Sequence, residues 1–264
     1  MNDHYRSVAV AAATKAGKLL LEERGKPREV TKKGEVEMVT EMDRRAEALI
    51  VDALRSAFPD HSILAEEGTK VEGSAPFRWL IDPIDGTTNY AHGFPVFCVA
   101  VALEREGVPV LGVAYDPSRE ELFLAERGRG ASLNGDPIRV SDSASLNDSL
   151  LATGFPYDIR VNPHNNLAEY AAFSLRCRGV RRLGSAVLDL CYVAAGRLDG
   201  FWELRLGPWD MAAGALMVEE AGGVVTDLLG GPFALDKLQV VASNGRIHRE
   251  MVALLVELSR GNPA

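Results

Sequence analysis

Two aspartates that directly follow an apolar run carry the first signal of chemistry. Residues 79–81 have the character of a buried strand, and Asp82 and Asp85 come at its carboxyl end, with Pro83 delaying the start of a helix. Carboxylates at this spacing in a turn can converge on one point, and the carbonyl of Ile84 points from the same turn. A hard cation such as Mg²⁺ prefers these oxygen ligands and retains water and substrate phosphate in its shell. The spacing therefore predicts a Mg²⁺ site at this strand end.

The residues after the aspartates suit a phosphate group. Gly86 leaves the backbone accessible, and Thr87 and Thr88 offer capping hydroxyls where a helical turn can begin, so that amides would face an anion. The alternative is a strand end with an aspartate cap and a tight turn, which is common for a single Asp-Gly pair. Two acids, a glycine and paired threonines together favour the functional interpretation.

Three other acids are weaker candidates when each is taken alone. Glu66 and Glu67 end a second apolar run, but a Glu-Glu pair is usually a solvated surface feature. Asp210 stands where an apolar helix is expected to begin, and an aspartate there is commonly an N-cap. A cap and a metal ligand do not exclude each other.

The elements that must position these groups follow from periodicity. Apolar residues at helical spacing predict helices over 5–20 and 41–58, the first ending near Gly25 and the second starting at a capping-box pattern from Thr40 to Asp43. Short apolar runs predict strands at 62–65, 78–81, 96–103 and 108–115.

From about residue 150 the predicted strands and helices alternate along the chain, which indicates an α/β arrangement. Strands are expected at 150–153, 224–226 and 240–242, and helices at 167–175, 186–195, 211–221 and 248–258. A stretch rich in serine and aspartate at 141–148 marks a hinge, so we expect an α+β half over residues 1–145 and an α/β half over 146–264.

Composition narrows the class of protein. The chain has 264 residues, 47% of them hydrophobic, which is enough for a large core. A net charge of -8 argues against nucleic-acid binding as the main function. Cys98, Cys177 and Cys191 lack metal-ligand spacing and suggest buried, reduced thiols. With no signal peptide or spanning apolar run, a cytoplasmic protein without membrane contact is expected.

Motifs along nearly the whole chain are similar to those of the inositol monophosphatase family of magnesium-dependent, lithium-sensitive phosphatases. The matching segments are residues 39–43, 65–68, 79–90, 112–117, 133–135, 184–186, 203, 209–214 and 220–223. This resemblance implies the layered αβαβα sandwich shared with fructose-1,6-bisphosphatases, with the active site between the halves. It also implies a homodimer.

The resemblance implies a set of metal ligands. One ion would be held by Glu66, Asp82 and the carbonyl of Ile84, and a second by Asp82, Asp85 and Asp210. A third, weaker ion near Glu66 is described for some family members, so two or three Mg²⁺ ions per site are expected. Such ions neutralise phosphate, activate water and stabilise the leaving oxygen.

The family also implies roles around the substrate. Glu66 and Thr87 would position the attacking water, with Asp43 orienting Thr87. The amides of Gly86 and Thr87 would bind phosphate. The sugar-like ring of a phosphomonoester would contact Asp85, Gly184, Ser185, Ala186, Glu203 and Asp210. Glu66 and Ile84 complete the substrate-binding set that the resemblance implies.

Three positions leave alternatives open. Lys32 matches a family lysine near the metals, although neighbouring Lys33 could take its place in the alignment. Without the resemblance, Glu203 would be interpreted as a partly exposed acid. Gly207 stands where bacterial members of the family often have a residue with a side chain. This difference affects the expected recognition of the ring rather than the metal chemistry.

The residues after Gly86 resemble the sequence motif of inositol monophosphatases. The expected activity is therefore hydrolysis of inositol 1-phosphate and related polyol monophosphates. The alternatives are a fructose-1,6-bisphosphatase or a phosphatase for nucleotide 3′-phosphates or histidinol phosphate. A metal-binding regulatory protein without turnover is a different class of function. Lost ligands would be expected in that case, and none is missing here.

Overall fold

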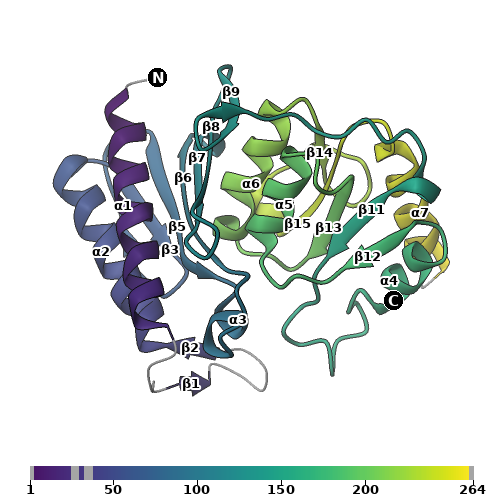
Figure 1. Cartoon of the computed structure of the whole chain (residues 1–264), viewed down its shortest axis with the longest axis horizontal. Coiled ribbons are helices and arrows are strands. Elements are labelled where there is room, and N and C mark those ends of the chain that lie inside the picture. Colours follow the sequence, from purple (N-terminus) through teal and green to yellow (C-terminus); the bar gives the residue numbers. More distant parts are fainter. Residues whose placement is uncertain (1–2, 25–29, 33–37, 262–264) are drawn as a thin grey trace.

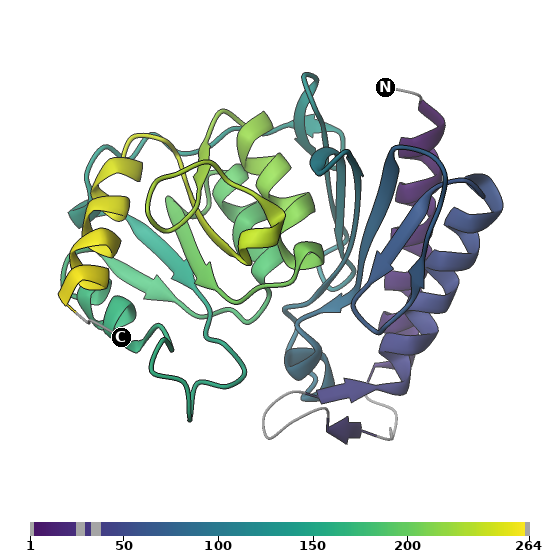
Figure 2. The ribbon, with the colours of Figure 1, turned by 180° about the vertical axis from the view of Figure 1, so that it is seen from behind.

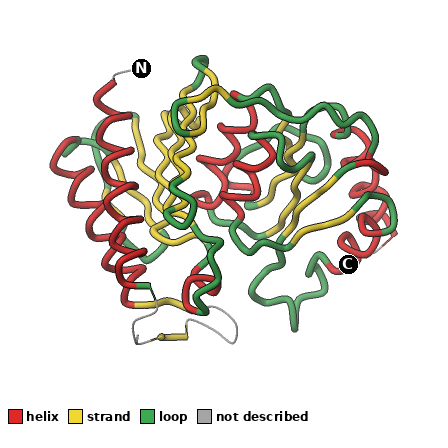
Figure 3. Tube along the Cα trace, viewed as in Figure 1, coloured by secondary structure: helices red, strands yellow, loops and turns green. Residues whose placement is uncertain are grey.

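The computed structural model describes residues 3–24, 30–32 and 38–261, with the backbone alone for 30–32, 38–40 and 261. Five layers follow one another across the molecule, in the order helices, sheet, helices, sheet, helices (Figure 1). The tube view shows the same alternation of helix and strand layers (Figure 3). The predicted αβαβα sandwich is therefore confirmed.

The first layer consists of α1 (Asp3–Glu23) and α2 (Glu41–Ala57), close to the predicted ranges. Its buried face carries small and aliphatic residues, among them Ala9, Ala16, Leu20, Ile50 and Leu54. Small side chains let the helices lie close to the sheet, and the apolar stripe at helical spacing is what drives them onto it.

The second layer is an eight-stranded sheet in the order β10-β9-β8-β7-β6-β5-β3-β4. All neighbours are antiparallel except β3 and β5, which run parallel. Its strands are β3 (Ser62–Ala65), β4 (Lys70–Val71), β5 (Phe77–Asp85), β6 (Cys98–Arg105), β7 (Val108–Asp116), β8 (Glu121–Glu126), β9 (Gly130–Leu133) and β10 (Asp136–Pro137). A separate pair, β1 (Val30–Lys32) and β2 (Met38–Thr40), lies at one end of α1, and α3 (Thr87–Ala91) follows β5.

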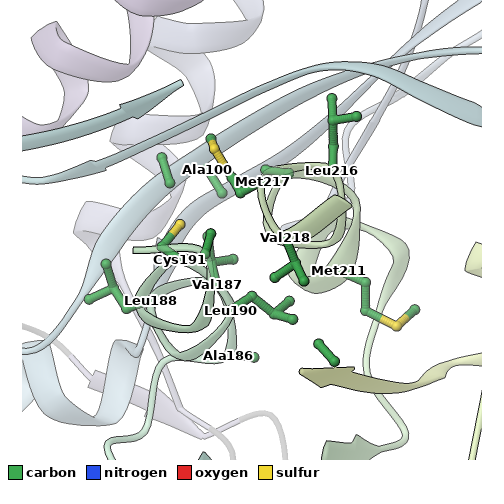
Figure 4. Close-up of a cluster of buried hydrophobic side chains, with 14 of the residues drawn as sticks. Ala100, Ala186, Val187, Leu188, Leu190, Cys191, Met211, Leu216, Met217 and Val218 are labelled. Carbon is green, nitrogen blue, oxygen red and sulfur yellow. The ribbon is translucent and has the colours of Figure 1, made fainter. Parts of the chain in front are cut away.

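The central layer is formed by α5 (Ala186–Ala194) and α6 (Pro208–Glu220). Both helices are apolar on nearly every side because each faces a sheet on two sides, as the view from behind also shows (Figure 2). Side chains of the two helices interlock with one another and reach Ala100 on β6 (Figure 4). This packing fixes the amino ends of both helices relative to β5.

The remaining layers complete the second half. A five-stranded mixed sheet has the order β12-β11-β13-β15-β14, and α4 and α7 cover its outer face. The elements are β11 (Leu150–Thr153), α4 (Leu167–Ser174), β12 (Gly179–Arg181), β13 (Gly200–Leu204), β14 (Val224–Thr226), β15 (Gln239–Ser243) and α7 (His248–Gly261), with short 3₁₀ turns at Leu146–Asp148 and Leu235–Lys237.

Several elements were missed or misjudged from the sequence. The sheet ends formed by β4 and β8–β10 and the inner strand β13 were not predicted, because short strands with charged residues or glycine at their ends give little periodic signal. Strand β5 extends to Asp85 rather than ending at Ile81. The first helix ends at Glu23, close to the predicted end near Gly25. Gly25 itself and the Thr40 side chain lie outside the described residues.

Two remaining expectations concern cysteines and membranes. Cys98 and Cys191 are buried free thiols, but Cys177 is partly exposed, so its predicted burial was wrong. Cys177 follows the end of α4 and packs, partly buried, against the core cluster around Phe173. Across the described ranges, no helix combines the length and apolarity needed to span a membrane.

Candidate metal and phosphate site

A bulge in β5 brings the two aspartates to one side. Asp82 pairs with Ala100 on β6 and Asp85 pairs with Cys98, so β5 uses one residue more than β6 over this stretch. Bulges bend a strand and redirect its side chains, and they are among the few interior strand positions that tolerate proline, which here is Pro83. The backbone N–H of Ile84 donates to Asp82 Oδ1 at 2.9 Å, which holds the turn.

Asp82, Asp85 and Asp210 form one acidic centre, their nearest ligand atoms all lying within 4.8 Å of one another. Burial, together with the charges of Glu66, Asp85 and Asp210, raises the pKa of Asp82 well above its usual value. Burial and the charge of Asp85 raise the pKa of Asp210 in the same way. A divalent cation would remove this repulsion, so the donor set fits a hard metal ion.

Glu66 lies beside this acidic centre, in side-chain hydrogen-bond contact with Asp82. The turn that carries it is fastened by Glu47, a buried acid on α2 that sequence reasoning missed. Glu47 accepts hydrogen bonds from the N–H groups of Glu67 and Thr69 at 2.8 and 3.2 Å. Its spacing of one helical turn from Asp43, on the same face of α2, was the available signal.

Asp85 joins the first sheet to the central helices. The hydroxyl of Ser185 donates to Asp85 Oδ2 at 2.5 Å, and the N–H groups of Ala186 and Val187 donate to the same carboxylate at 3.2 and 2.7 Å. Ser185 is also the N-cap of α5 and accepts from the N–H of Leu188. These donors oppose the burial that raises the pKa of Asp85, so the carboxylate is fixed at a helix amino end.

Thr87 is held by two acceptors. Its hydroxyl lies 3.0 Å from Asp43 Oδ1 and 3.0 Å from the carbonyl oxygen of Ile84, and Asp43 is fully buried. Gly86 precedes it with φ 96° at the start of α3, and a Cβ there would come within 3.0 Å of the carbonyls of Gly184 and Val96. Only glycine fits this conformation and this close approach.

Asp210 is not the N-cap that the alternative interpretation suggested. Pro208 begins α6 and Gly207 is its N-cap, so Asp210 is the third helical residue. Its Oδ2 accepts a hydrogen bond from the N–H of Gly207 at 2.6 Å. Pro208 suits the first helical position, and an acid in the first turn also satisfies a free backbone donor.

Glu203 on β13 is 9% exposed, so the interpretation as a partly exposed acid was wrong. Burial, opposed by Arg182 and increased by Asp85, raises the pKa of Glu203 to about 8. A Cβ on Gly154 would overlap the Glu203 carboxylate, so these two residues are in direct contact. The Glu203 carboxylate therefore contacts the start of the loop that follows β11.

A second buried acid near Glu203 was also missed. Asp189 on α5 is 1% exposed, its Oδ1 has no hydrogen-bond partner within the described residues, and burial with the charge of Glu203 raises its pKa well above the usual value. An acid inside an apolar helix just after Gly184 and Ser185 was the signal that could have found it. Lys32 lies in β1, but its side chain is outside the described part, as is Lys33 as a whole.

Comparison with known proteins gives a consistent result. The profile described as the inositol monophosphatase family matches residues 1–260. The chain is 46% identical over 249 residues to the inositol-1-monophosphatase of Synechocystis sp., covering 94% of this chain and 87% of that protein. It is 47% identical over 258 residues to the Nus factor SuhB of Pseudomonas aeruginosa, covering 94% of both.

A solved structure agrees with the sequence relatives. The inositol monophosphatase of Anabaena superposes with a TM-score of 0.87 at 44% identity, covering 95% of this chain and 94% of that one. The fold, the acidic centre and the relatives thus all indicate a phosphatase of the superfamily in which metal-dependent hydrolysis is the rule. The chain belongs to the inositol monophosphatase family.

Proposed function

We propose that the protein is a Mg²⁺-dependent phosphomonoesterase that hydrolyses inositol 1-phosphate and related polyol monophosphates to the polyol and phosphate. The observation that carries the proposal is the meeting of Asp82, Asp85 and Asp210 within 4.8 Å, with Glu66 beside them. These acids come from two strand ends and a helix of the other half, so the site is built by the fold rather than by one local turn.

The ligands proposed for Mg²⁺ are the acidic centre, Glu66 and the carbonyl of Ile84. When bound, the ions supply charge neutralisation of the phosphate and a bound water that ionises more readily than bulk water. The chain holds the carboxylates ready for this. The hydrogen bonds from Ile84, Ser185, Val187 and Gly207 fix at least one oxygen of each of the three aspartates.

Thr87 is proposed to orient the attacking water. Both of its close neighbours, Asp43 Oδ1 and the Ile84 carbonyl, are hydrogen-bond acceptors, so the single hydroxyl hydrogen is committed to them. The remaining lone pairs of Oγ1 can accept a hydrogen bond from water. A lone pair aimed at water positions it for in-line attack, with Glu66 as the second acceptor.

The substrate phosphate is proposed to bind the amides of Gly86 and Thr87, and the polyol ring to contact Asp85, Gly184, Ala186 and Glu203. Because the pKa of Glu203 is raised to about 8, this acid is largely protonated near neutral pH before the site is filled. In that form it can both donate to and accept from ring hydroxyls.

A substrate panel tests the proposal. Purified protein would be assayed with Mg²⁺ and inositol 1-phosphate, fructose 1,6-bisphosphate, histidinol phosphate and adenosine 3′,5′-bisphosphate, with Asp82→Asn as the inactive control. We expect the highest kcat/KM for inositol 1-phosphate and no activity after removal of Mg²⁺ with a chelator. A clear preference for another substrate would replace inositol phosphate in the proposal, and release no greater than in the control would end it.

A second candidate follows from the relatives named Nus factor SuhB, which are as similar to this chain as the phosphatases are. A net charge of -8 does not favour direct contact with nucleic acid, so a Nus-factor role would act through protein partners. Asp82→Asn expressed in a bacterium lacking its own Nus factor SuhB separates the two. Restoration by this inactive variant supports the Nus-factor role, and restoration by the active protein alone supports the phosphatase.

Lithium sensitivity, a homodimer and a cytoplasmic location belong to the same proposal and rest on the family resemblance. Inhibition by millimolar-range LiCl and the mass from light scattering test the first two. Fractionation of the producing cell tests the third.

A further inference from the structure

Two buried acids lie one helical turn apart on the buried face of α2. Asp43 is fully buried and Glu47 is 5% exposed. Like charges at this spacing destabilise a helix, and burial makes an unpaired charge more costly still. Two such acids on one helix face therefore need hydrogen-bond donors from elsewhere in the fold. Asp43 receives one from the Thr87 hydroxyl, and Glu47 receives its donors from the turn that carries Glu66.

Glu47 uses both of its carboxylate oxygens on this turn. Its Oε2 accepts from the N–H of Glu67 at 2.8 Å, and its Oε1 accepts from the N–H and the hydroxyl of Thr69 at 3.2 and 2.5 Å. The turn joins β3 to β4 and closes on itself through the N–H of Ala65, which donates to the carbonyl of Thr69 at 2.9 Å. Three donors from one short turn thus converge on a single side chain of α2.

These bonds fix the backbone on both sides of Glu66. Its own N–H donates to the carbonyl of Ile81 on β5 at 3.1 Å, one residue before Asp82. The next N–H along the chain, that of Glu67, donates to Glu47. The planar peptide groups before and after the Glu66 Cα are therefore both held, and two fixed planes determine the direction of the Cα–Cβ bond between them.

Helix α2 thereby reaches both groups that are proposed to hold the attacking water. Asp43 contacts Thr87 directly. Glu47 holds Glu66 through the N–H of the residue that follows it. Because both acids are on one helix, their fixed spacing sets how the two water acceptors lie relative to each other. Loss of either acid would let one acceptor move away from the other.

We propose that Glu47 is a positioning residue that holds Glu66 in place for a Mg²⁺ ion and for the attacking water. This inference rests on the proposed function, in which Glu66 is a metal ligand and a water acceptor. Glu47 acts on the ion through the turn rather than by contacting it. A buried acid that only completed the fold would stabilise the protein without affecting one metal ion more than another. The two roles therefore differ in their effect on Mg²⁺ binding.

The test compares Glu47→Gln with the wild type. The amide keeps the shape of the side chain but has a single acceptor oxygen, and its NH₂ group would face an N–H donor of the turn. We expect kcat to fall about 10- to 100-fold, the usual range for a residue that orients a metal ligand. Isothermal titration calorimetry should show about tenfold or greater weakening of one Mg²⁺ ion. Glu41→Gln, the same change at an exposed acid of α2, should leave both quantities unchanged.

The Glu66→Gln background separates positioning from a general structural role. In this background Glu47→Gln should weaken the remaining Mg²⁺ ion no further, because the carboxylate through which it acts has already been removed. An equal loss of Mg²⁺ affinity with and without the Glu66 carboxylate would overturn the inference. Unchanged Mg²⁺ binding in Glu47→Gln alone would also overturn it.

Thr69→Val gives a second measurement if Glu47→Gln does not fold. It removes only the hydroxyl bond to Oε1 of Glu47, so the same Mg²⁺ ion should be weakened by a smaller factor, and unchanged binding would contradict the inference. The proposed function fails separately, when the wild type releases no phosphate from any ester of the panel. Calorimetry with Mg²⁺ alone then still decides the inference, because it does not depend on turnover. A wild type that binds no Mg²⁺ would overturn both.

Discussion

The acidic centre and the aromatic cluster around His61 are two regions that bury ionisable groups for different reasons. His61 is 8% exposed and stacks on Phe58 and Phe77 at centroid distances of 5.1 and 5.0 Å. Its Nδ1 has no hydrogen-bond partner in the described part of the chain. Burial lowers the pKa of His61, with Asp60 opposing, so the neutral ring is the stable form.

Burial also disfavours the charged form of the aspartates in the acidic centre. Unlike His61, these aspartates are surrounded by hydrogen-bond donors and by other acids. Backbone N–H groups and the Ser185 hydroxyl hold the carboxylates in place, although mutual repulsion opposes ionisation. Such an arrangement destabilises the metal-free protein, because the carboxylates repel one another. A bound cation would relieve this repulsion and would therefore be held tightly. A buried titratable group therefore indicates function when its surroundings hold it in place for a charge that the chain itself does not neutralise.

The largest effect is expected from Asp210→Asn. The variant should lower kcat roughly a hundredfold or more and weaken Mg²⁺ binding, because one carboxylate of the centre is lost. It should also raise the thermal unfolding temperature of the Mg²⁺-free protein, because repulsion with Asp85 is relieved while the amide oxygen can still accept from Gly207. Enzyme kinetics and thermal unfolding with and without Mg²⁺ measure both.

The control for this variant is Asp236→Asn, an exposed aspartate in a 3₁₀ turn, which should change neither property. Unchanged Mg²⁺ dependence and rate in Asp210→Asn would show that the acidic centre is structural, like the His61 cluster.

An intermediate effect is expected from Asp43→Asn. The Thr87 hydroxyl would lose its carboxylate acceptor, so kcat should fall by about 10- to 100-fold, the usual range for residues that orient a metal-site group. Mg²⁺ affinity should change less than in Asp210→Asn. Steady-state kinetics over a Mg²⁺ titration separate these quantities.

Asp52→Asn is the matched control, because Asp52 is an exposed residue of the same helix. A parallel loss in both variants would mean that α2 as a whole, rather than the contact with Thr87, had been disturbed.

The smallest effect concerns His61 and pH. The unfolded chain, with a histidine pKa near about 6.5, binds a proton more readily than the folded chain. The free energy of unfolding should therefore fall as the pH drops below roughly 6.5 toward the folded pKa. His61→Phe should remove this part of the pH dependence and leave kcat at neutral pH unchanged, as measured by unfolding between about pH 8 and pH 5.

His164→Phe, a change at an exposed histidine, is expected to keep the wild-type pH profile. If both variants had the same profile as the wild type, His61 would not be buried in the neutral form as described.

Most of the residues proposed to carry the chemistry could be predicted from the sequence. The residues that hold them in place could not. The aspartates of β5 and the threonine after them were found from local spacing, and the helices from their periodicity. Glu47 and Asp189 were missed because each acts through residues distant in sequence, and the local signals, an acid one helical turn from Asp43 and an acid inside an apolar helix, are weak when taken alone. Strand β13 was missed although it carries Glu203, because Gly200 at its start and the acid itself interrupt the short apolar run that predicted the other strands.

Residue type and short-range order were enough to find the acids of the centre, the main helices, most of the inner strands and the family to which the motifs belong. The tertiary structure alone brings Asp210 to Asp82 and lets Ser185 cap a helix while it donates to Asp85 across 100 residues. Those contacts exist because α5 and α6 pack between two sheets, and that packing is a property of the whole core rather than of any local segment.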